Sequence, residues 1–256
     1  MKLYAVKTKV ICVGDNLVDV ILDALKEQGL ELEDKDIIAL TSKVVAYAEN
    51  RLIKLSEIEP SEKAEELAKR FSLQPAFAEL ILKEADRIYG GVAKAVLTLK
   101  NGILTANAGI DNKNAPMDYA ILWSCNPQKW AGYIREEIKS RTGRRVGVLI
   151  VDSGLVPLRK GTVGLALAVA GFKPIKDRRG EKDIYGKPIT ITQHAVADDL
   201  ASAAHFLMGE AAEKTPLVII RGANVDFDNG VYDSADMAMP QKECIFMGTF
   251  LAERKN

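Results

Sequence analysis

The most constraining feature of the chain is the run from Val146 to Val151 (VGVLIV), which contains no polar side chain. A short, fully apolar run of this length predicts a strand that other elements must cover. Asp36 to Thr41 (DIIALT) also predicts a buried strand. Leu3 to Val6 and Leu217 to Ile220 predict two further strands. The chain is therefore expected to build a packed core around several strands.

Five segments carry the caps, stop signals and apolar spacing of helices. The first runs over 17–28 with Asp15-Asn16 as its cap, and the second begins at Pro60-Ser61. The third runs from Pro75 to Gly90-Gly91 and the fourth from Pro127 to Gly143. The fifth has Asp198 as its cap and ends at Met208. Asn101-Gly102 predicts a tight turn between strands over 96–99 and 103–106, because these residue types tolerate positive φ angles. Thr162 to Phe172 is expected to be extended or tightly packed.

These elements do not alternate regularly, which predicts an α+β fold with mixed sheets and packed helices. The sequence shows no internal repeat and no obvious linker, so residues 1–256 are expected to form a single unit. Two lobes built from discontinuous segments are compatible with this pattern. Residues 223–256, with Pro240 in their middle, are expected to form an irregular C-terminal tail.

Composition excludes several classes of protein. The 35 Lys and Arg residues balance 35 Asp and Glu residues, so the chain lacks the positive surplus with which proteins hold nucleic acid by its phosphates. The N-terminus carries charges where a signal peptide needs apolar residues, and the longest apolar stretch, Gly164 to Phe172, is too short to span a bilayer. Three cysteines without a CxxC pair suggest a reducing compartment. A cytoplasmic protein that binds neither nucleic acid nor membrane is expected.

Oxygen-bearing side chains stand where predicted elements end. Asp111 lies just past the hairpin, Asp152 and Ser153 follow the VGVLIV strand, and Glu210 follows the helix stop at Gly209. Such ligands can converge on hard cations such as Mg²⁺ or Mn²⁺, which neutralise phosphate oxygens. Because the chain has only two histidines, any metal would rest mostly on oxygen ligands. The alternative role, as turn or cap residues, stays open, since spacing does not show convergence.

Two basic clusters offer positive charge for small anions. Arg159-Lys160-Gly161 is one, and the stretch from Lys176 to Lys182 is the other. Each is either an anion-binding loop or a solvated surface loop. The chain contains no GxxxxGK[ST] loop, no GxGxxG fingerprint after a strand and no kinase signature. Any nucleotide would therefore be bound by an uncommon fold.

A series of short segments, in this order and spacing, resembles the coenzyme F420-0:γ-glutamyl ligase family from the N-terminus to about residue 225. The segments are Ser42-Lys43-Val44-Val45, Ala48-Glu49, Asn107-Ala108-Gly109-Ile110-Asp111 with Asn114, Gly147 to Ser153, Arg159-Lys160-Gly161, Gly180, Asp183, Tyr185-Gly186, Ala197-Asp198-Asp199, Met208-Gly209-Glu210 and Arg221-Gly222. Each segment alone is a weak signal, and their combination is specific.

The resemblance implies a fold, a reaction and a set of site residues. It implies an unusual α+β fold in an intertwined homodimer, and an enzyme that uses GTP or ATP to join L-glutamate to an acceptor carboxylate. Asp111 and Asp152 are then expected to bind one divalent ion, and Ser153 and Glu210 a second. Catalysis is assigned to Asp111, Asp152, Lys43 and Arg159, the last two as contacts to phosphate or to the acceptor anion. The expected nucleotide contacts are Lys7, Thr8, Lys9, Val10, Ser42, Lys43, Asn114, Met208, Gly209, Glu210, Ala211, Ala212, Glu213, Lys214 and Thr215.

The chain departs from the family pattern near these expected sites. Ala46 and Tyr47 stand where the family has Ser-Lys, and Leu155-Val156 where it often has Gly-Arg. These changes resemble a branch of the family that extends folate, so the acceptor is expected to be coenzyme F420-0 or a folate. Two alternatives to a ligase with an acyl-phosphate intermediate stay open. One is a non-catalytic paralogue that keeps the metal and nucleotide sites, and the other is a metal-dependent phosphohydrolase.

Overall fold

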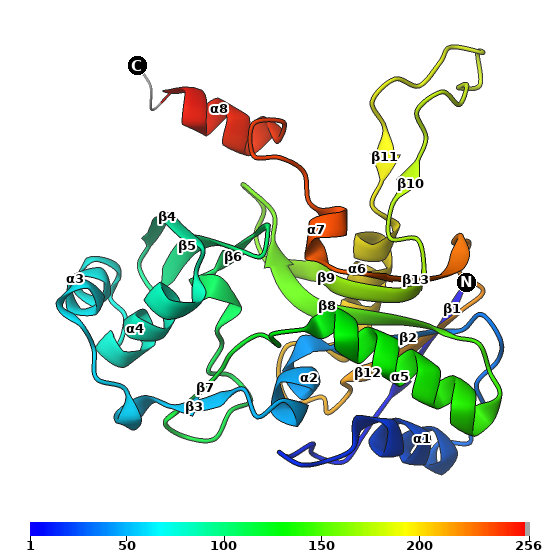
Figure 1. Ribbon diagram of the computed structural model, residues 1–256, viewed down its shortest axis with the longest axis horizontal. Coiled ribbons are helices and arrows are strands. Elements are labelled where there is room, and N and C mark those ends of the chain that lie inside the picture. Colours follow the sequence, from blue (N-terminus) through cyan, green and yellow to red (C-terminus); the bar gives the residue numbers. More distant parts are fainter. Residues whose placement is uncertain (254–256) are drawn as a thin grey trace.

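A six-stranded sheet forms the centre of the computed structural model, which describes residues 1–253 (Figure 1). The strand order is β1-β12-β2-β8-β9-β13. Among these strands, β2 and β8 pair in parallel, with Thr41 opposite Val151, and the other neighbours pair antiparallel. The strands are β1 (Lys2–Val6), β2 (Ile37–Thr41), β8 (Gly147–Leu155), β9 (Thr162–Phe172), β12 (Leu217–Arg221) and β13 (Phe227–Tyr232).

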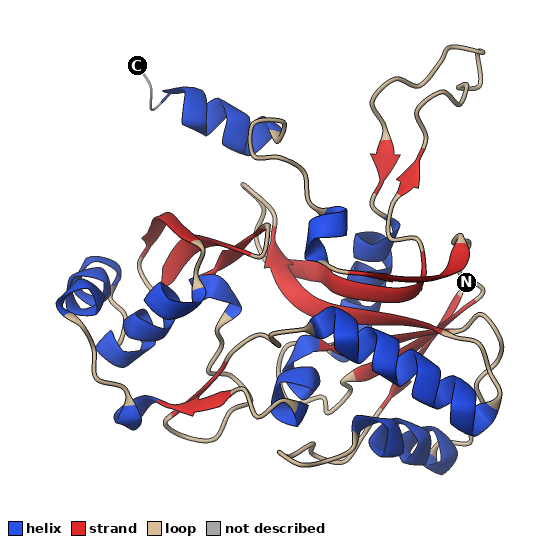
Figure 2. Ribbon diagram, in the orientation of Figure 1, coloured by secondary structure: helices blue, strands red, loops and turns tan. Residues whose placement is uncertain are grey.

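Helices cover both faces of this sheet, which explains why its central strands are apolar throughout (Figure 2). α1 (Leu17–Glu27), α2 (Ser42–Ala48) and α5 (Pro127–Thr142) pack on one face, and α6 (Val196–Met208) packs on the other. Alternate residues of β8 enter the two cores, so that Val148 lies on the α5 side and Leu149 on the α6 side. The predicted strand VGVLIV is therefore confirmed as a fully buried strand.

Residues 51–121 form a second packed region, called here the small lobe, which lies beside the main sheet in Figure 1. Its sheet has the order β4-β5-β6, and β3 pairs with β7 in a ribbon that leads back to the main sheet. Its elements are β3 (Leu52–Lys54), a 3₁₀ turn (Leu55–Glu57), α3 (Glu62–Phe71), α4 (Pro75–Glu84), β4 (Arg87–Val92), β5 (Ala95–Lys100), β6 (Ile103–Ala106), a second 3₁₀ turn (Asn107–Gly109) and β7 (Tyr119–Ile121).

The structure confirms the predicted mixture of helices and strands and several local signals. Asn16 caps α1 by accepting a hydrogen bond from the backbone N–H of Val18 at 2.9 Å. Asn101 and Gly102 both adopt positive φ in the turn between β5 and β6. The helix predicted from Pro75 is shorter than expected. It ends at Glu84, and Gly90-Gly91 lie within β4, where the pairing with β5 is irregular.

Two further predictions are wrong. Asp198 is not the cap of α6, which begins at Val196; instead the Asp198 carboxylate accepts the backbone N–H of Ala166 at 2.9 Å and ties the helix to β9. The chain after Gly222 is not irregular, because β13 extends the main sheet and places Phe227 and Tyr232 against the α6-side core. The helices α7 (Ser234–Met237) and α8 (Ile245–Glu253) follow it.

A long arm, residues 173–195, projects from the sheet in Figure 1, with β10 (Lys176–Asp177) and β11 (Gln193–His194) near its base. Ile184 and Tyr185 at its far end are exposed. None of the described helices has the length and apolar character that a membrane crossing requires.

Asp36 should be a main anchor of the sheet, since its carboxylate is buried and accepts two hydrogen bonds from Arg221, at 2.9 and 2.8 Å. Asp36→Asn is expected to lower the free energy of unfolding by about 2–4 kcal/mol, because it leaves a guanidinium without its buried partner. Glu33→Gln is the matched control, because Glu33 pairs with the same guanidinium from an exposed position. Urea unfolding measures both, and equal losses would contradict the anchoring role.

Candidate active site

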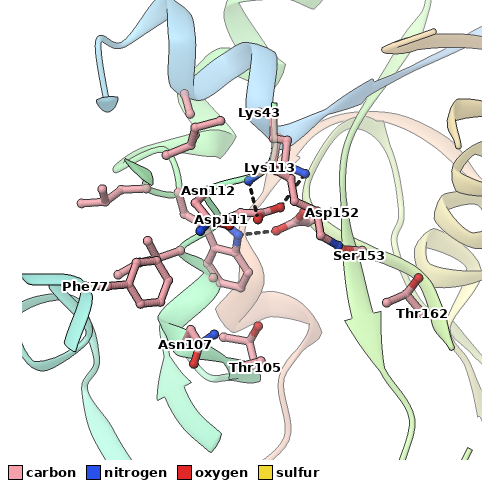
Figure 3. Close-up of a pocket in the computed structure, with 18 of the residues that line it drawn as sticks. Lys43, Phe77, Thr105, Asn107, Asp111, Asn112, Lys113, Asp152, Ser153 and Thr162 are labelled. Carbon is pink, nitrogen blue, oxygen red and sulfur yellow. Dashed lines mark hydrogen bonds and ion pairs between the residues drawn. The ribbon is translucent and has the colours of Figure 1, made fainter. Parts of the chain in front are cut away.

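The parallel pairing of β2 with β8 brings two polar segments to one edge of the sheet. Ser42 and Lys43 begin α2 directly after β2, and Asp152 and Ser153 lie in β8 directly after Val151. Asp111 approaches from the small lobe, and its carboxylate lies 2.7 Å from the Lys43 ammonium (Figure 3). The structure therefore brings Lys43, Asp111 and Asp152 together from three separate segments.

Backbone contacts hold Asp111 in place. It exchanges two hydrogen bonds with Ile121 at the end of β7, at 3.0 and 2.7 Å. Its side chain also accepts the backbone N–H of Lys113 at 2.9 Å. Burial alone would raise the pKa of Asp111, but the hydrogen bond and charge of Lys43 hold that pKa below its usual value. The Asp111 carboxylate is thus kept ionised.

Asp152 lies in a more enclosed place. Burial raises the pKa of its carboxyl group, although the backbone of Ser153, the indole of Trp123 and the charge of Lys43 act in the opposite direction. The indole Nε1–H of Trp123 donates directly to Oδ2 of Asp152. The Trp123 ring packs on Gly109, where an added Cβ would lie 2.1 Å from Cε2 of the ring. Gly109 therefore sets the position of the indole, and the indole orients Asp152.

Glu210 follows α6 and has partners of its own. Its Oε1 accepts the Thr162 hydroxyl at 2.6 Å and lies 2.8 Å from Nε2 of His205. Burial would raise its pKa, but the Thr162 and His205 hydrogen bonds and the charge of Lys43 lower it. Glu210 is accordingly an ionised acid within the electrostatic reach of Lys43.

Two cavities meet at Lys43, which lines both of them. The first has a volume of about 580 Å³ and lies between the main sheet and the small lobe, with Phe77 and Thr105 on the small-lobe side and Asp152 on the other. The second has a volume of about 310 Å³ and lies between the 8–11 segment and the 208–216 segment. Both volumes suit small-molecule ligands. The arrangement offers one cation to two ligands bound side by side.

Comparison with known proteins identifies the family. A sequence model of F420-0:γ-glutamyl ligases matches residues 5–222. The chain belongs to this family. The coenzyme F420:L-glutamate ligase of Methanocaldococcus jannaschii is 43% identical over 216 residues, which cover 84% of this chain and 86% of that protein. The protein with the same description from Methanothermobacter thermautotrophicus is 39% identical over 239 residues, or 92% of this chain and 94% of that protein. This F420-0:γ-glutamyl ligase family member is thus an enzyme that forms an amide bond.

Most residues that were expected to contact nucleotide line the second cavity of this family member. They are Thr8, Lys9, Val10, Lys43, Asn114 and the stretch from Met208 to Thr215. Ser42 lines the first cavity instead, and Lys7 lines neither. Arg159 lies in the exposed turn between β8 and β9 and is not among the lining residues of either cavity. In the arm, Arg178 pairs with Glu181 and Arg179 with Asp177, so these cations are already neutralised.

The donor set of this ligase fits a hard divalent ion in its chemistry, because the acids and Ser153 offer oxygen ligands. The described residues contain no group of three or more His, Cys, Asp or Glu side chains arranged to hold a metal. Each acid already bonds a neighbouring side chain, such as Lys43 for Asp111 and Trp123 for Asp152. On binding an ion, an acid would therefore give up this bond or share its carboxylate between the side chain and the ion.

Three residues that shape the ligase site carry no signal of this role in the sequence. Trp123 orients Asp152, and Thr162 and His205 hold Glu210. His205 lies on α6, and nothing in the pattern of that helix indicates a partner five residues away. Trp123 lies two residues after the short strand β7, and this position carries no signal of a carboxylate partner.

Gly109→Ala should disturb the site through Trp123. Gly109 and Gly143 both have φ of +74°, but nothing lies within 4 Å of a Cβ at Gly143. Gly143→Ala should cost about 1–2 kcal/mol for the left-handed backbone alone. Gly109→Ala should cost about 1–3 kcal/mol more from overpacking, and should shift the tryptophan fluorescence. Equal costs with unchanged fluorescence would contradict the role of Gly109 in placing the indole.

Proposed function

We propose that the chain is a γ-glutamyl ligase that depends on a nucleoside triphosphate and divalent ions and adds L-glutamate to an acceptor carboxylate. The observation that carries the proposal is the position of Lys43 on the wall shared by two cavities, 2.7 Å from Asp111. The second cavity takes the nucleotide, with its phosphates toward Lys43. The first cavity takes the acceptor, with its carboxylate toward the same ammonium.

The reaction proceeds in two balanced steps. An oxygen of the acceptor carboxylate attacks the γ-phosphorus, the bond from that phosphorus to the bridging oxygen breaks, and the nucleoside diphosphate leaves. The product is an acyl phosphate. The amine of L-glutamate then attacks the acyl carbon, the bond from that carbon to the phosphate oxygen breaks, inorganic phosphate leaves, and the amine loses a proton. The result is an amide.

The residues of the chain reduce the repulsion between two anions. The Lys43 ammonium faces both cavities and draws the carboxylate and the phosphates together. The indole of Trp123 keeps Asp152 directed into the first cavity. In this proposal Asp111 and Asp152 hold one divalent ion, and Ser153 and Glu210 hold a second. When bound, such ions neutralise phosphate oxygens.

The relatives are described as ligases that join L-glutamate to coenzyme F420, and this supports F420-0 as the acceptor. GTP is proposed as the nucleotide, with ATP as the competitor in the assay. A reduced folate is the second acceptor to test. Product mass separates one added glutamate from several.

Asp152→Asn should lower the rate of glutamate-dependent phosphate release by at least about 100-fold, since it removes a charge at the reacting groups. The assay contains GTP, Mn²⁺ or Mg²⁺, L-glutamate and F420-0. Asp23→Asn, on the exposed face of α1, is the matched control and should retain the wild-type rate. Thermal unfolding of both variants excludes loss of the fold. A wild-type rate for Asp152→Asn would contradict the assigned role.

The same assay distinguishes the two alternatives. A phosphohydrolase releases phosphate without needing glutamate or an acceptor. A non-catalytic paralogue binds nucleotide in calorimetry and releases no phosphate with F420-0 or a reduced folate. Either result would overturn the ligase proposal.

The assembly is proposed to be a homodimer. Ile184 and Tyr185 on the arm and Phe246 and Phe250 on α8 are large apolar side chains that are 91, 82, 48 and 60% exposed in the single chain. Burial of such side chains favours association. Light scattering after size-exclusion chromatography should give twice the mass of the chain, and a monomer across micromolar concentrations would refute this part of the proposal.

A further inference from the structure

Two hydrogen bonds link three distant segments around the second cavity. The hydroxyl of Tyr47, on α2, donates to the backbone carbonyl of Asn114 at 2.9 Å. The side-chain amide of Asn114 donates to the backbone carbonyl of Ala211 at 3.2 Å. Tyr47, Asn114 and Ala211 all line the cavity. We call this chain of contacts the strap.

Tyr47 is the fixed end of the strap. Its ring is half-buried and packs against the core between α1, α5 and the sheet. Burial raises the pKa of Tyr47, so the hydroxyl keeps the proton that it donates. A rigid ring on a packed helix loses little conformational freedom when its hydroxyl bonds a loop.

Asn114 is the middle of the strap, and both its backbone conformation and its side chain suit this position. Its φ is +60°, a conformation that asparagine adopts more readily than most residues. Its backbone carbonyl accepts from one wall of the cavity while its side chain donates to the other. A single residue thereby joins the 111–118 loop to both neighbours.

The two loops that the strap joins also carry acids. Asn114 lies three residues after Asp111, and Ala211 directly follows Glu210. The 209–215 loop is further tied by the backbone bond from Thr8 to Lys214 at 3.1 Å. The Asn114–Ala211 bond therefore connects the loop that carries Asp111 with the loop that carries Glu210.

We propose that Tyr47 is a positioning residue that holds the 111–118 and 209–215 loops together and so determines the affinity of the second cavity for a nucleoside triphosphate. The inference rests on the proposed function only in the identity of this ligand. Tyr47 acts through Asn114 and not on the reacting groups. Its loss should therefore weaken nucleotide binding and leave the chemical step and glutamate binding nearly unchanged.

The decisive comparison is Tyr47→Phe against Tyr133→Phe. Tyr133 lies on α5 outside both cavities and is the matched control for loss of a phenol hydroxyl. Hydrogen exchange of the ligand-free protein should become faster in 111–118 and 209–215 in Tyr47→Phe alone. The Kd for GTP with Mn²⁺, measured by calorimetry without acceptor or glutamate, should rise about three- to tenfold, as the loss of one hydrogen bond predicts.

Turnover provides a readout that general destabilisation would not reproduce. Tyr47→Phe should raise KM for GTP by the same factor, with kcat and KM for L-glutamate within about twofold of wild type. Asn114→Asp keeps the size of the side chain and removes the donor to Ala211. Because Asn114 itself lines the cavity, this variant is compared only in hydrogen exchange of the ligand-free protein. Its effect on exchange in 209–215 should not add to that of Tyr47→Phe, because both variants break the same chain of contacts.

The possible outcomes decide separate parts of the inference. Unchanged exchange in both loops of Tyr47→Phe would overturn the strap, whatever the enzyme's activity. Faster exchange with an unchanged Kd for GTP would overturn its role in affinity, and fully additive effects of the two variants on exchange would overturn the strap. A wild-type chain that binds no nucleotide would refute the proposed function and the role in affinity together, while the exchange data would still decide whether the strap holds the loops.

Discussion

The parallel pairing of β2 with β8 is the constraint on which the site depends. Because the carboxyl ends of parallel strands meet at the same edge, the register of Thr41 opposite Val151 delivers Lys43 and Asp152 to one place. An antiparallel pairing of the same two strands would put these side chains at opposite ends of the sheet. Helices on both faces protect this pair, and this cover requires the apolar composition of both strands.

Lys43 is the cation that the three acids of the site have in common. Its charge acts to lower the pKa of Asp111, Asp152 and Glu210, and Lys113 adds to this at Asp111 and His205 at Glu210. Enclosed carboxylates need such compensating positive charge. An incoming triphosphate and an acceptor carboxylate would add negative charge to the same place. This added charge supports the role given to divalent ions in the proposed reaction.

Local signals in the sequence predicted several caps and turns, but they did not show which residues converge in space. Asn16 as a helix cap and Asn101-Gly102 as a turn were predictable because each depends on its own backbone. The 7-residue helix α2 begins directly after a strand and has no side-chain hydrogen bond at its N-cap, so its start carries no signal in the sequence. The contact of Asp111 with Lys43 depends on the register of β2 with β8 and on the docking of the small lobe. The spacing of residues along the sequence encodes neither of these. The family resemblance supplied that convergence instead.

Asp111 belongs to the small lobe and Asp152 to the main sheet, so their separation depends on how the two parts are held together. Arg51 stands at this junction, donating to the carbonyl of Trp123 at 3.0 Å and to the carboxylate of Glu84 at 2.9 Å. Lys100, which is buried, pairs with the same carboxylate. Arg51 and Glu84 are partly buried. A partly buried ion cluster of this kind contributes little net stability compared with apolar packing, but removing one member leaves the others uncompensated. Its directional contacts favour one docking of the lobe, and that docking keeps Asp111 within reach of Lys43.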